Sequence, residues 1–192
     1  ISPERLAAAR AAPPYALDRL TSPRVALLIG GDSQHFRFTD DDSARLIQRV
    51  QALAGQGASL MATVSRRTPE RLATGLRPIV QEAKGFFWDG TGENPYVALL
   101  ALADAVLVTA DSVNMVGEAA ATGKPLMVFT PSGGTPKITK FLRGLDAAGA
   151  LVPVDGTLSL PYEAIDSTPA IAVDLARRYK AHRTPWVIGD ER

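Results

Sequence analysis

From residue 24 onward, short apolar runs alternate with longer stretches whose apolar residues recur at helical spacing. Residues 25–29, 60–64 and 105–109 are typical of buried strands, because each run is almost wholly apolar and only about five residues long. Residues 39–53 show helical spacing, with apolar side chains three or four positions apart. Such alternation predicts right-handed βαβ units, and therefore a parallel sheet covered by helices on both faces.

This pattern predicts a Rossmann-like, three-layer α/β domain over residues 24–192. Strands are expected at 25–29, 60–64, 85–88, 105–109, 126–129 and 151–154, and helices at 39–53, 69–83, 94–103, 112–122, 136–148 and 170–181. Thr68 and Asn94 are expected to cap helices that begin with proline. Residues 1–23 are expected to be a connector with one short helix after Ser2.

The composition narrows the class of protein. A chain of 192 residues with 46% hydrophobic and 21% charged residues can form one globular domain without disulfide staples. Its net charge of +1 gives no general attraction to polyanions, so no nucleic-acid partner is expected. The absence of cysteine excludes disulfides and thiolate chemistry. No histidine pair has metal-ligand spacing, so neither a metal nor a cofactor is expected.

Ligands of parallel sheets bind beyond the carboxyl ends of the strands, so the residues that follow each strand are the candidates for a site. The first strand is followed by Gly30, Gly31, Asp32 and Ser33. Two glycines let a backbone turn sharply and approach a ligand, which suits a phosphate held by amide N–H groups. The run matches neither a dinucleotide fingerprint nor a P-loop, and an ordinary turn is the alternative.

Basic residues follow two other strands. Arg66 and Arg67 stand just before an expected helix, where guanidinium groups and free amides together make an anion site. Lys137 lies in the first turn of a later helix, where its charge opposes the helix dipole and makes an anionic partner more favourable.

Polar residues also follow the strand at 105–109. Asp111 or Ser112 is expected to cap the next helix, and Asn114 to face the crevice. Glu118 lies about two turns along that helix, where its carboxylate could accept the hydroxyls of a ribose or simply face solvent. The small residues that follow it, 119–121, indicate close packing and favour the crevice. Asn94 is a further candidate, although helix capping explains it equally well.

The spacing of Asp111-Ser112, Glu118-Ala119 and Gly123-Lys124-Pro125 resembles the C-terminal half of the glycosyltransferase-B fold. That fold includes sugar-nucleotide glycosyltransferases and the UDP-N-acetylglucosamine 2-epimerases. The resemblance implies that Glu118 binds a ribose and that the Gly30-Gly31 loop lies near a diphosphate. Val113-Asn114 stands where the epimerases have Gly-Gly, which makes this helix start less open to a diphosphate.

A set of segments between residues 24 and 154 is more similar to the "elongated mitochondria" fission family of bacteria and plants, labelled as predicted nucleoside-diphosphate-sugar epimerases. The segments are Leu28-Ile29-Gly30-Gly31-Asp32, Ser65-Arg66-Arg67-Thr68, Gly92-Glu93-Asn94-Pro95-Tyr96, the run 109–119, and Gly134-Thr135-Pro136-Lys137. This resemblance implies the fold and the ligand class, and it leaves the reaction open.

Three functions are compatible with these residues. The first is binding of a nucleoside-diphosphate sugar by the donor half of a glycosyltransferase-like enzyme. The second is sugar-nucleotide epimerisation, for which Asp32, His35, Glu93 and Asp111 are the acid–base groups near the sheet edge, none of them assigned as catalytic. The third is a protein-interaction role without catalysis, suggested by the Val113-Asn114 replacement.

The chain starts with Ile1 rather than Met, which predicts a piece of a longer protein. Its N-terminal partner domain is expected to be missing, so the piece is expected to be inactive by itself. The expected partners are a sugar nucleotide and that domain. No apolar run approaches the ~18 residues of a spanning helix. A bacterial cytoplasmic protein is therefore expected, with peripheral membrane contact left open.

Overall fold

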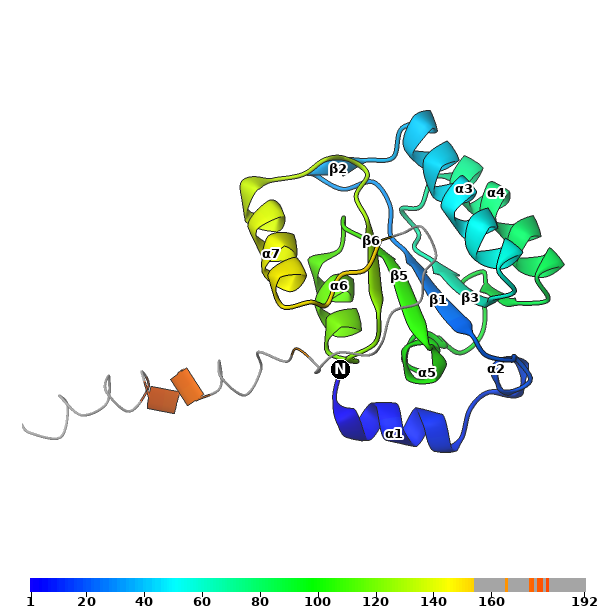
Figure 1. The fold of residues 1–192 in the computed structure, drawn as a ribbon, viewed down its shortest axis with the longest axis horizontal. Coiled ribbons are helices and arrows are strands. Elements are labelled where there is room, and N and C mark those ends of the chain that lie inside the picture. Colours follow the sequence, from blue (N-terminus) through cyan, green and yellow to red (C-terminus); the bar gives the residue numbers. More distant parts are fainter. Residues whose placement is uncertain (154–164, 166–172, 175, 178, 180–192) are drawn as a thin grey trace, which may run out of the picture.

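The computed structural model describes residues 1–153, 165, 173–174, 176–177 and 179. Its centre is a sheet of five parallel strands in the order β4-β3-β1-β5-β6 (Figure 1). The strands are β1 (Arg24–Ile29), β3 (Ser59–Val64), β4 (Phe86–Trp88), β5 (Ala105–Thr109) and β6 (Leu126–Phe129). Each agrees within about a residue with its predicted range, so the predicted α/β class and parallel sheet are confirmed.

Helices cover both faces of this sheet (Figure 1). The helices are α3 (Asp40–Gly55), α4 (Glu70–Glu82), α5 (Tyr96–Leu102), α6 (Val113–Ala120) and α7 (Pro136–Ala147). Side chains of β1 alternate between two cores: Leu27 joins the core under α3 and α4, and Leu28 joins the core under α5 and α6. The predicted three layers are therefore present, because the central strands β1, β3 and β5 are buried on both faces.

The chain order places a topological switch beside β1. From β1 the chain moves to β3 and β4 on one side, and then returns to β5 and β6 on the other side. The loops that follow β1 and β5 leave neighbouring strands in opposite directions, and in folds of this kind ligands bind at such a point. Residues 30–33 and 111–114 lie in and beside these loops, so the fold brings the two main candidate segments together.

Several local predictions need correction. Thr68 does not cap α4, which starts after Pro69 without a side-chain cap. Helix α5 likewise starts after Pro95, although the Asn94 Oδ1 atom accepts the Tyr96 N–H at 3.0 Å. The strand expected at 151–154 is reduced, within the described residues, to one bridge between Leu126 and Leu151. The helix expected at 170–181 lies largely outside the described residues.

The N-terminal segment is packed against the domain. Helix α1 (Pro3–Ala11) starts at the predicted Ser2 cap and contacts α5. Helix α2 (Tyr15–Asp18) is a short element that the sequence did not indicate. Leu6, Leu17 and Leu20 are buried in the core under α5 and α6. The segment that was expected to be a connector thus contributes apolar side chains to the core.

Two-residue strands join the loops at the carboxyl edge. Strand β2 (Phe36–Arg37) pairs antiparallel with β7 (Ser132–Gly133). Close by, the buried Asp42 carboxylate accepts the N–H groups of Thr39 and Ser132 at 3.1 and 3.0 Å. Burial raises the pKa of Asp42, but these hydrogen bonds outweigh it and hold the pKa far below its usual range. Asp42 therefore fixes the rim of the crevice as a permanent anion.

Candidate functional site

The backbone amides of the loop after β1 are already used inside the protein. Those of residues 30 to 33 all donate hydrogen bonds of 2.8 to 3.1 Å. Their acceptors, in order, are Thr109 Oγ1, Asp111 Oδ2, the Arg67 carbonyl and the Phe36 carbonyl. The prediction that these amides cradle a phosphate is corrected by this geometry, because an amide that donates internally has no proton left for a ligand.

The two glycines are needed for contacts within the protein. A Cβ atom on Gly30 would lie 2.2 Å from a carboxylate oxygen of Asp111, and one on Gly31 would lie 2.0 Å from the carbonyl oxygen of Arg67. Neither glycine has a positive φ angle. Because glycine has no side chain, β1, the turn after β3 and the start of α6 can approach one another closely. The sequence had instead suggested that the glycines let the backbone approach a ligand.

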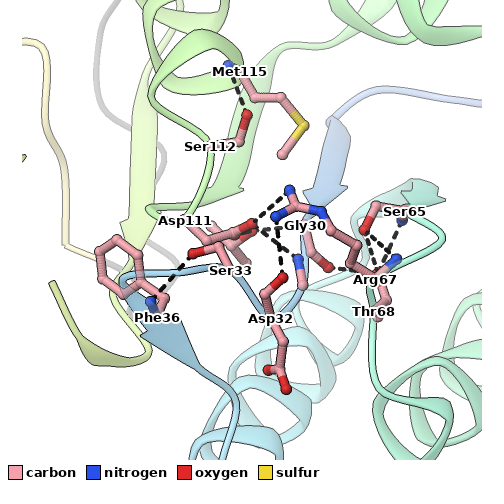
Figure 2. A network of polar contacts seen from close by, with 12 residues as sticks. Gly30, Asp32, Ser33, Phe36, Ser65, Arg67, Thr68, Asp111, Ser112 and Met115 are labelled. Atoms are coloured by element: carbon pink, nitrogen blue, oxygen red, sulfur yellow. Dashed lines mark hydrogen bonds and ion pairs between the residues drawn. The ribbon is translucent and has the colours of Figure 1, made fainter.

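Asp111 organises this junction from a buried position. Its side chain is fully buried, and its oxygens accept the Gly31 N–H at 2.9 Å and the Thr109 hydroxyl at 2.7 Å. The guanidinium of Arg67 lies 3.6 Å from Oδ2 (Figure 2). Asp111 therefore holds the loop and Arg67 in place.

Asp32 and Ser33 stabilise the turn that leads into β2. The Asp32 carboxylate accepts the Phe38 N–H at 2.9 Å. This hydrogen bond lowers the pKa of Asp32, and the nearby Arg37 lowers it to a smaller extent. Ser33 Oγ accepts the Phe36 N–H at 3.2 Å (Figure 2). Both side chains thus have internal partners, and their role toward a ligand stays a prediction.

The two arginines after β3 provide positive charge at the crevice. The Arg67 side chain is 52% exposed and also donates to the Asp32 carbonyl at 3.1 Å. Figure 2 shows its guanidinium beside the Asp111 carboxylate, with Ser112 and Met115 of the α6 start above it. Arg66 is exposed, and its side chain makes no hydrogen bond or ion pair with the part of the chain that the structure describes.

The start of α6 offers unused hydrogen-bond donors beside Arg67. Ser112 caps the helix, and its hydroxyl accepts the Met115 N–H at 3.4 Å, as predicted. The amides of Val113 and Asn114 have no acceptor among the described residues, as expected for the first turn of a helix. Both side chains are exposed, so the chain keeps these amides near solvent despite lacking the Gly-Gly pair.

Glu118 lies further along the same helix and is partly accessible, with 37% of its side chain exposed. It lines a cavity of about 370 Å³ between α6 and α7, together with Asn114 and Gly117. The Tyr96 hydroxyl donates to Glu118 Oε2 at 2.6 Å. Burial, and then the adjacent Glu118 carboxylate, raise the pKa of Tyr96, so this phenol stays protonated.

Three other predicted or motif residues lie apart from this group. Asn94 lines a different cavity of about 860 Å³, next to α1 and Trp88. Lys137 is exposed in the first turn of α7, and no hydrogen bond or ion pair joins it to the loops after β1 and β3 within the described residues. Lys124 caps the carbonyl end of α5, where its ammonium donates to two backbone carbonyls at 2.8 and 2.9 Å.

Sequence reasoning missed the roles of Thr109, Thr68 and Tyr96. Thr109 was assigned only to a strand, yet its hydroxyl accepts the Gly30 N–H. The Thr68 hydroxyl donates to the Gly30 carbonyl. The contact of Tyr96 with Glu118 spans 22 positions of sequence. No local pattern indicates such a contact. Among the described residues, no group of three or more potential ligands could hold a metal ion.

The pattern that defines the mitochondrial fission ELM1 family matches residues 1–179. The chain belongs to this family. The mitochondrial fission protein ELM1 of Arabidopsis thaliana is 29% identical over 167 residues, which are 84% of this chain and 39% of that protein. An uncharacterized protein of Rickettsia prowazekii is 32% identical over 114 residues, or 56% of this chain and 31% of the relative. The chain thus spans less than two fifths of the length of either curated relative.

Solved structures share the general arrangement at low similarity. Os79 from O. sativa in complex with UDP has a TM-score of 0.47 and 22% identity, covering 87% of this chain and 35% of that one. A glycosyltransferase of Streptomyces sp. SF2575 with thymidine diphosphate has a TM-score of 0.45 and 18% identity, covering 85% and 35%. The molybdenum cofactor carrier protein of Chlamydomonas reinhardtii has a TM-score of 0.46 and 18% identity, covering 81% and 99%. Likeness at this level says nothing about this chain's ligand.

Within the described residues, none of the helices has the length and apolar character needed to cross a bilayer.

Proposed function

We propose that this chain binds the diphosphate and ribose of a sugar nucleotide, as the donor half of a glycosyltransferase-B type enzyme. The observation that carries the proposal is the arrangement along α6. Arg67 and unused amides lie at its start, and the accessible carboxylate of Glu118 lies further along it. One helix thus presents a group of donors for an anion and, separately, an acceptor for hydroxyls.

The diphosphate is assigned to the start of α6. A helix N-terminus attracts anions through its free N–H groups and its dipole, and a guanidinium adds bidentate hydrogen bonds. Arg67 is held there by Asp111, and the exposed Arg66 precedes it in the same turn. In a transfer reaction the bond between the sugar and the diphosphate breaks, and its electron pair passes to the diphosphate oxygen. These donors would stabilise that charge.

The ribose is assigned to Glu118. A carboxylate accepts hydrogen bonds only, so it suits a pair of hydroxyls. From Val113 to Glu118 the helix rises about 8 Å, which is comparable to the length of a ribose-diphosphate unit. The resemblance of the Asp111-Ser112 and Glu118-Ala119 motifs to sugar-nucleotide enzymes supports the same assignment.

Calorimetric titration of the chain with UDP, TDP, GDP and ADP tests the proposal. At least one of them is expected to bind, and Glu118→Gln and Arg66→Ala are each expected to weaken it about tenfold, or ~1.4 kcal/mol. Glu70→Gln and Arg49→Ala are matched controls, because both residues are exposed on helices outside the site. Absence of binding by all four nucleotides, with the fold intact by circular dichroism, would refute the proposal.

A second candidate function, protein interaction without catalysis, has a specific observation in its favour. The amides of residues 30–33 are all used internally, and Val113 exposes 40% of its surface at the α6 start. Paired amides and an exposed apolar side chain suit contact with another protein better than they suit binding of a diphosphate. Two results together would favour this second function. The folded chain would bind no nucleotide, and it would capture a protein partner equally well with and without Arg66 and Arg67.

An epimerase reaction has less support from the same residues. Proton exchange at a sugar carbon needs a placed acid–base group. Asp111 is buried with both oxygens occupied, and Asp32 accepts a backbone amide. Solvent deuterium in a sugar nucleotide recovered after incubation with the longer protein would reinstate epimerisation.

A further inference from the structure

Tyr96 belongs to helix α5 and Glu118 to helix α6, and their side chains meet between the two helices. Tyr96 is the first residue of α5, and its ring packs against the core beneath α5 and α6. Its hydroxyl donates to Glu118 Oε2 at 2.6 Å, a short distance typical of a hydrogen bond to a charged acceptor. The phenol is therefore a buried donor directed at the accessible carboxylate of α6.

The backbone of Tyr96 is itself held in place. The Asn94 side chain accepts its N–H at 3.0 Å, and the Pro95 carbonyl accepts the Leu99 N–H at 2.9 Å. A tyrosine with a packed ring has little conformational freedom left, so its hydroxyl is a fixed point. Glu118, by contrast, has a long side chain that is partly exposed to solvent, and it would sample several rotamers without a partner.

The hydrogen bond leaves Glu118 able to accept more. Its second oxygen, Oε1, forms an ion pair with the amino nitrogen of Ile1 at 3.9 Å, a distance too long for a hydrogen bond. A carboxylate offers about four acceptor positions, and Tyr96 occupies one of them. Because the pKa of Tyr96 is raised by burial and by Glu118, the phenol remains a donor across the physiological range.

We propose that Tyr96 is the positioning residue that orients Glu118 toward the ribose and so sets discrimination between ribonucleotides and deoxyribonucleotides. The inference rests on the proposed function, because it assigns the ribose to Glu118. A carboxylate held in one orientation binds a ligand more tightly when both hydroxyls have the matching geometry. A ligand that lacks one hydroxyl loses that hydrogen bond and binds more weakly.

Titrations with UDP and 2′-deoxy-UDP, and with the corresponding pairs of ADP and GDP, test this inference in the full chain. Tyr96→Phe is expected to weaken binding of the tightest ribonucleotide about five- to tenfold, on the scale of one typical hydrogen bond. It is also expected to bring the affinity ratio of ribo- to deoxyribonucleotide close to one. Tyr15→Phe is the control, because Tyr15 is 84% exposed and should leave both values unchanged.

The double variant separates positioning from mere structural support. In the Glu118→Gln background, where the ribo-to-deoxy preference is already lost, Tyr96→Phe should cause no further loss of affinity. A structural role alone would lower the melting temperature and leave the ribo-to-deoxy ratio of Tyr96→Phe as in the unaltered chain, which would overturn the inference.

The failure of this inference is distinguishable from that of the proposed function. If Glu118→Gln loses the ribo-to-deoxy preference and Tyr96→Phe keeps it, the positioning role is wrong and the ribose assignment stands. If neither variant changes a preference that the unaltered chain shows, or if no nucleotide binds, the ribose assignment itself is wrong and the positioning role fails with it.

Discussion

Gly31 lies so close to the turn after β3 that the structure has no room for a side chain there. A Cβ atom would stand 2.0 Å from the Arg67 carbonyl oxygen and 2.4 Å from the Thr68 nitrogen, both backbone atoms that cannot rotate away. We expect Gly31→Ala to destabilise the chain by about 1–3 kcal/mol, because the two segments must separate. Urea denaturation followed by circular dichroism measures this loss.

Gly144→Ala is the matched control for this prediction. Gly144 lies inside the exposed helix α7, and no atom lies within 4 Å of the Cβ position. Alanine there should stabilise the chain by about 0.5–1 kcal/mol, because it restricts the unfolded backbone and favours helix. If both variants unfold at the same urea concentration, the close approach at Gly31 is not a constraint on the fold.

These residues show how far the candidate site could be predicted from sequence. The Gly30-Gly31 pair follows β1 and Glu118 lies in α6, as the predicted strand and helix require, while their role toward a ligand stays a prediction. What the glycines touch could not be predicted, because Asp111 is 80 positions away from its partner Gly31. Likewise, nothing in the local pattern connects Tyr96 with Glu118. Chain position is local information, whereas hydrogen-bond partners depend on the tertiary fold.

At the scale of elements, α5 depends on residues from two distant segments for its carbonyl end. Lys124 donates to the carbonyls of Leu100 and Ala101, and Arg10 Nε donates to the Ala101 carbonyl at 3.1 Å. Cations at this end also interact favourably with the helix dipole. The Gly123-Lys124-Pro125 motif therefore has a structural role away from Glu118, although the sequence resemblance grouped the two.

The protonation of Lys124 gives this element a testable pH dependence. Burial, and then the charge of Arg10, lower the pKa of Lys124 to about 8, whereas an unfolded lysine titrates near ~10.4. Between these values the unfolded chain binds a proton that the folded chain lacks, so stability should rise with pH. We expect the free energy of unfolding to rise by about 1 kcal/mol from pH 8 to 9.5, as measured by urea denaturation.

Two lysine variants check the origin of that rise. Lys124→Met should abolish it, because the titrating group is gone, and Lys140→Met should retain it, because Lys140 is exposed on α7. A rise of equal size in Lys124→Met would assign the effect to another group.

The elements also divide into those that the sequence specifies and those that it does not. Helix α3 follows from its apolar spacing and is capped by Thr39, and helix α4 continues through Pro78, a residue that can disturb a helix. Strands β2 and β7 are two residues long and could not be predicted, because their pairing depends on two loops meeting across the crevice. Local periodicity has no signal for an element that tertiary contact creates.

At the scale of the whole molecule, the fold gathers part of the candidate site, Arg66, Arg67 and the start of α6, at one edge of one sheet. The switch between β1 and β5 brings the turn after β3 and the start of α6 together, while Lys124 lies at the carbonyl end of α5. With a net charge of +1, the chain has no general attraction for polyanions, so we expect the proposed recognition of a diphosphate to depend on Arg66 and Arg67. This arrangement suits a small anionic ligand at a defined place.

The same arrangement predicts binding without turnover by this chain alone. Two of the candidate acid–base groups, Asp111 and Asp32, already have internal partners. A transfer reaction also needs an acceptor and a base to activate it. We therefore expect the chain to bind UDP-sugars by calorimetry and to release no UDP from them over several hours, as followed by chromatography.

A longer protein of the family should release UDP when its acceptor is supplied. Release by this chain alone, abolished by Glu118→Gln, would show instead that one sheet edge holds a complete catalytic site.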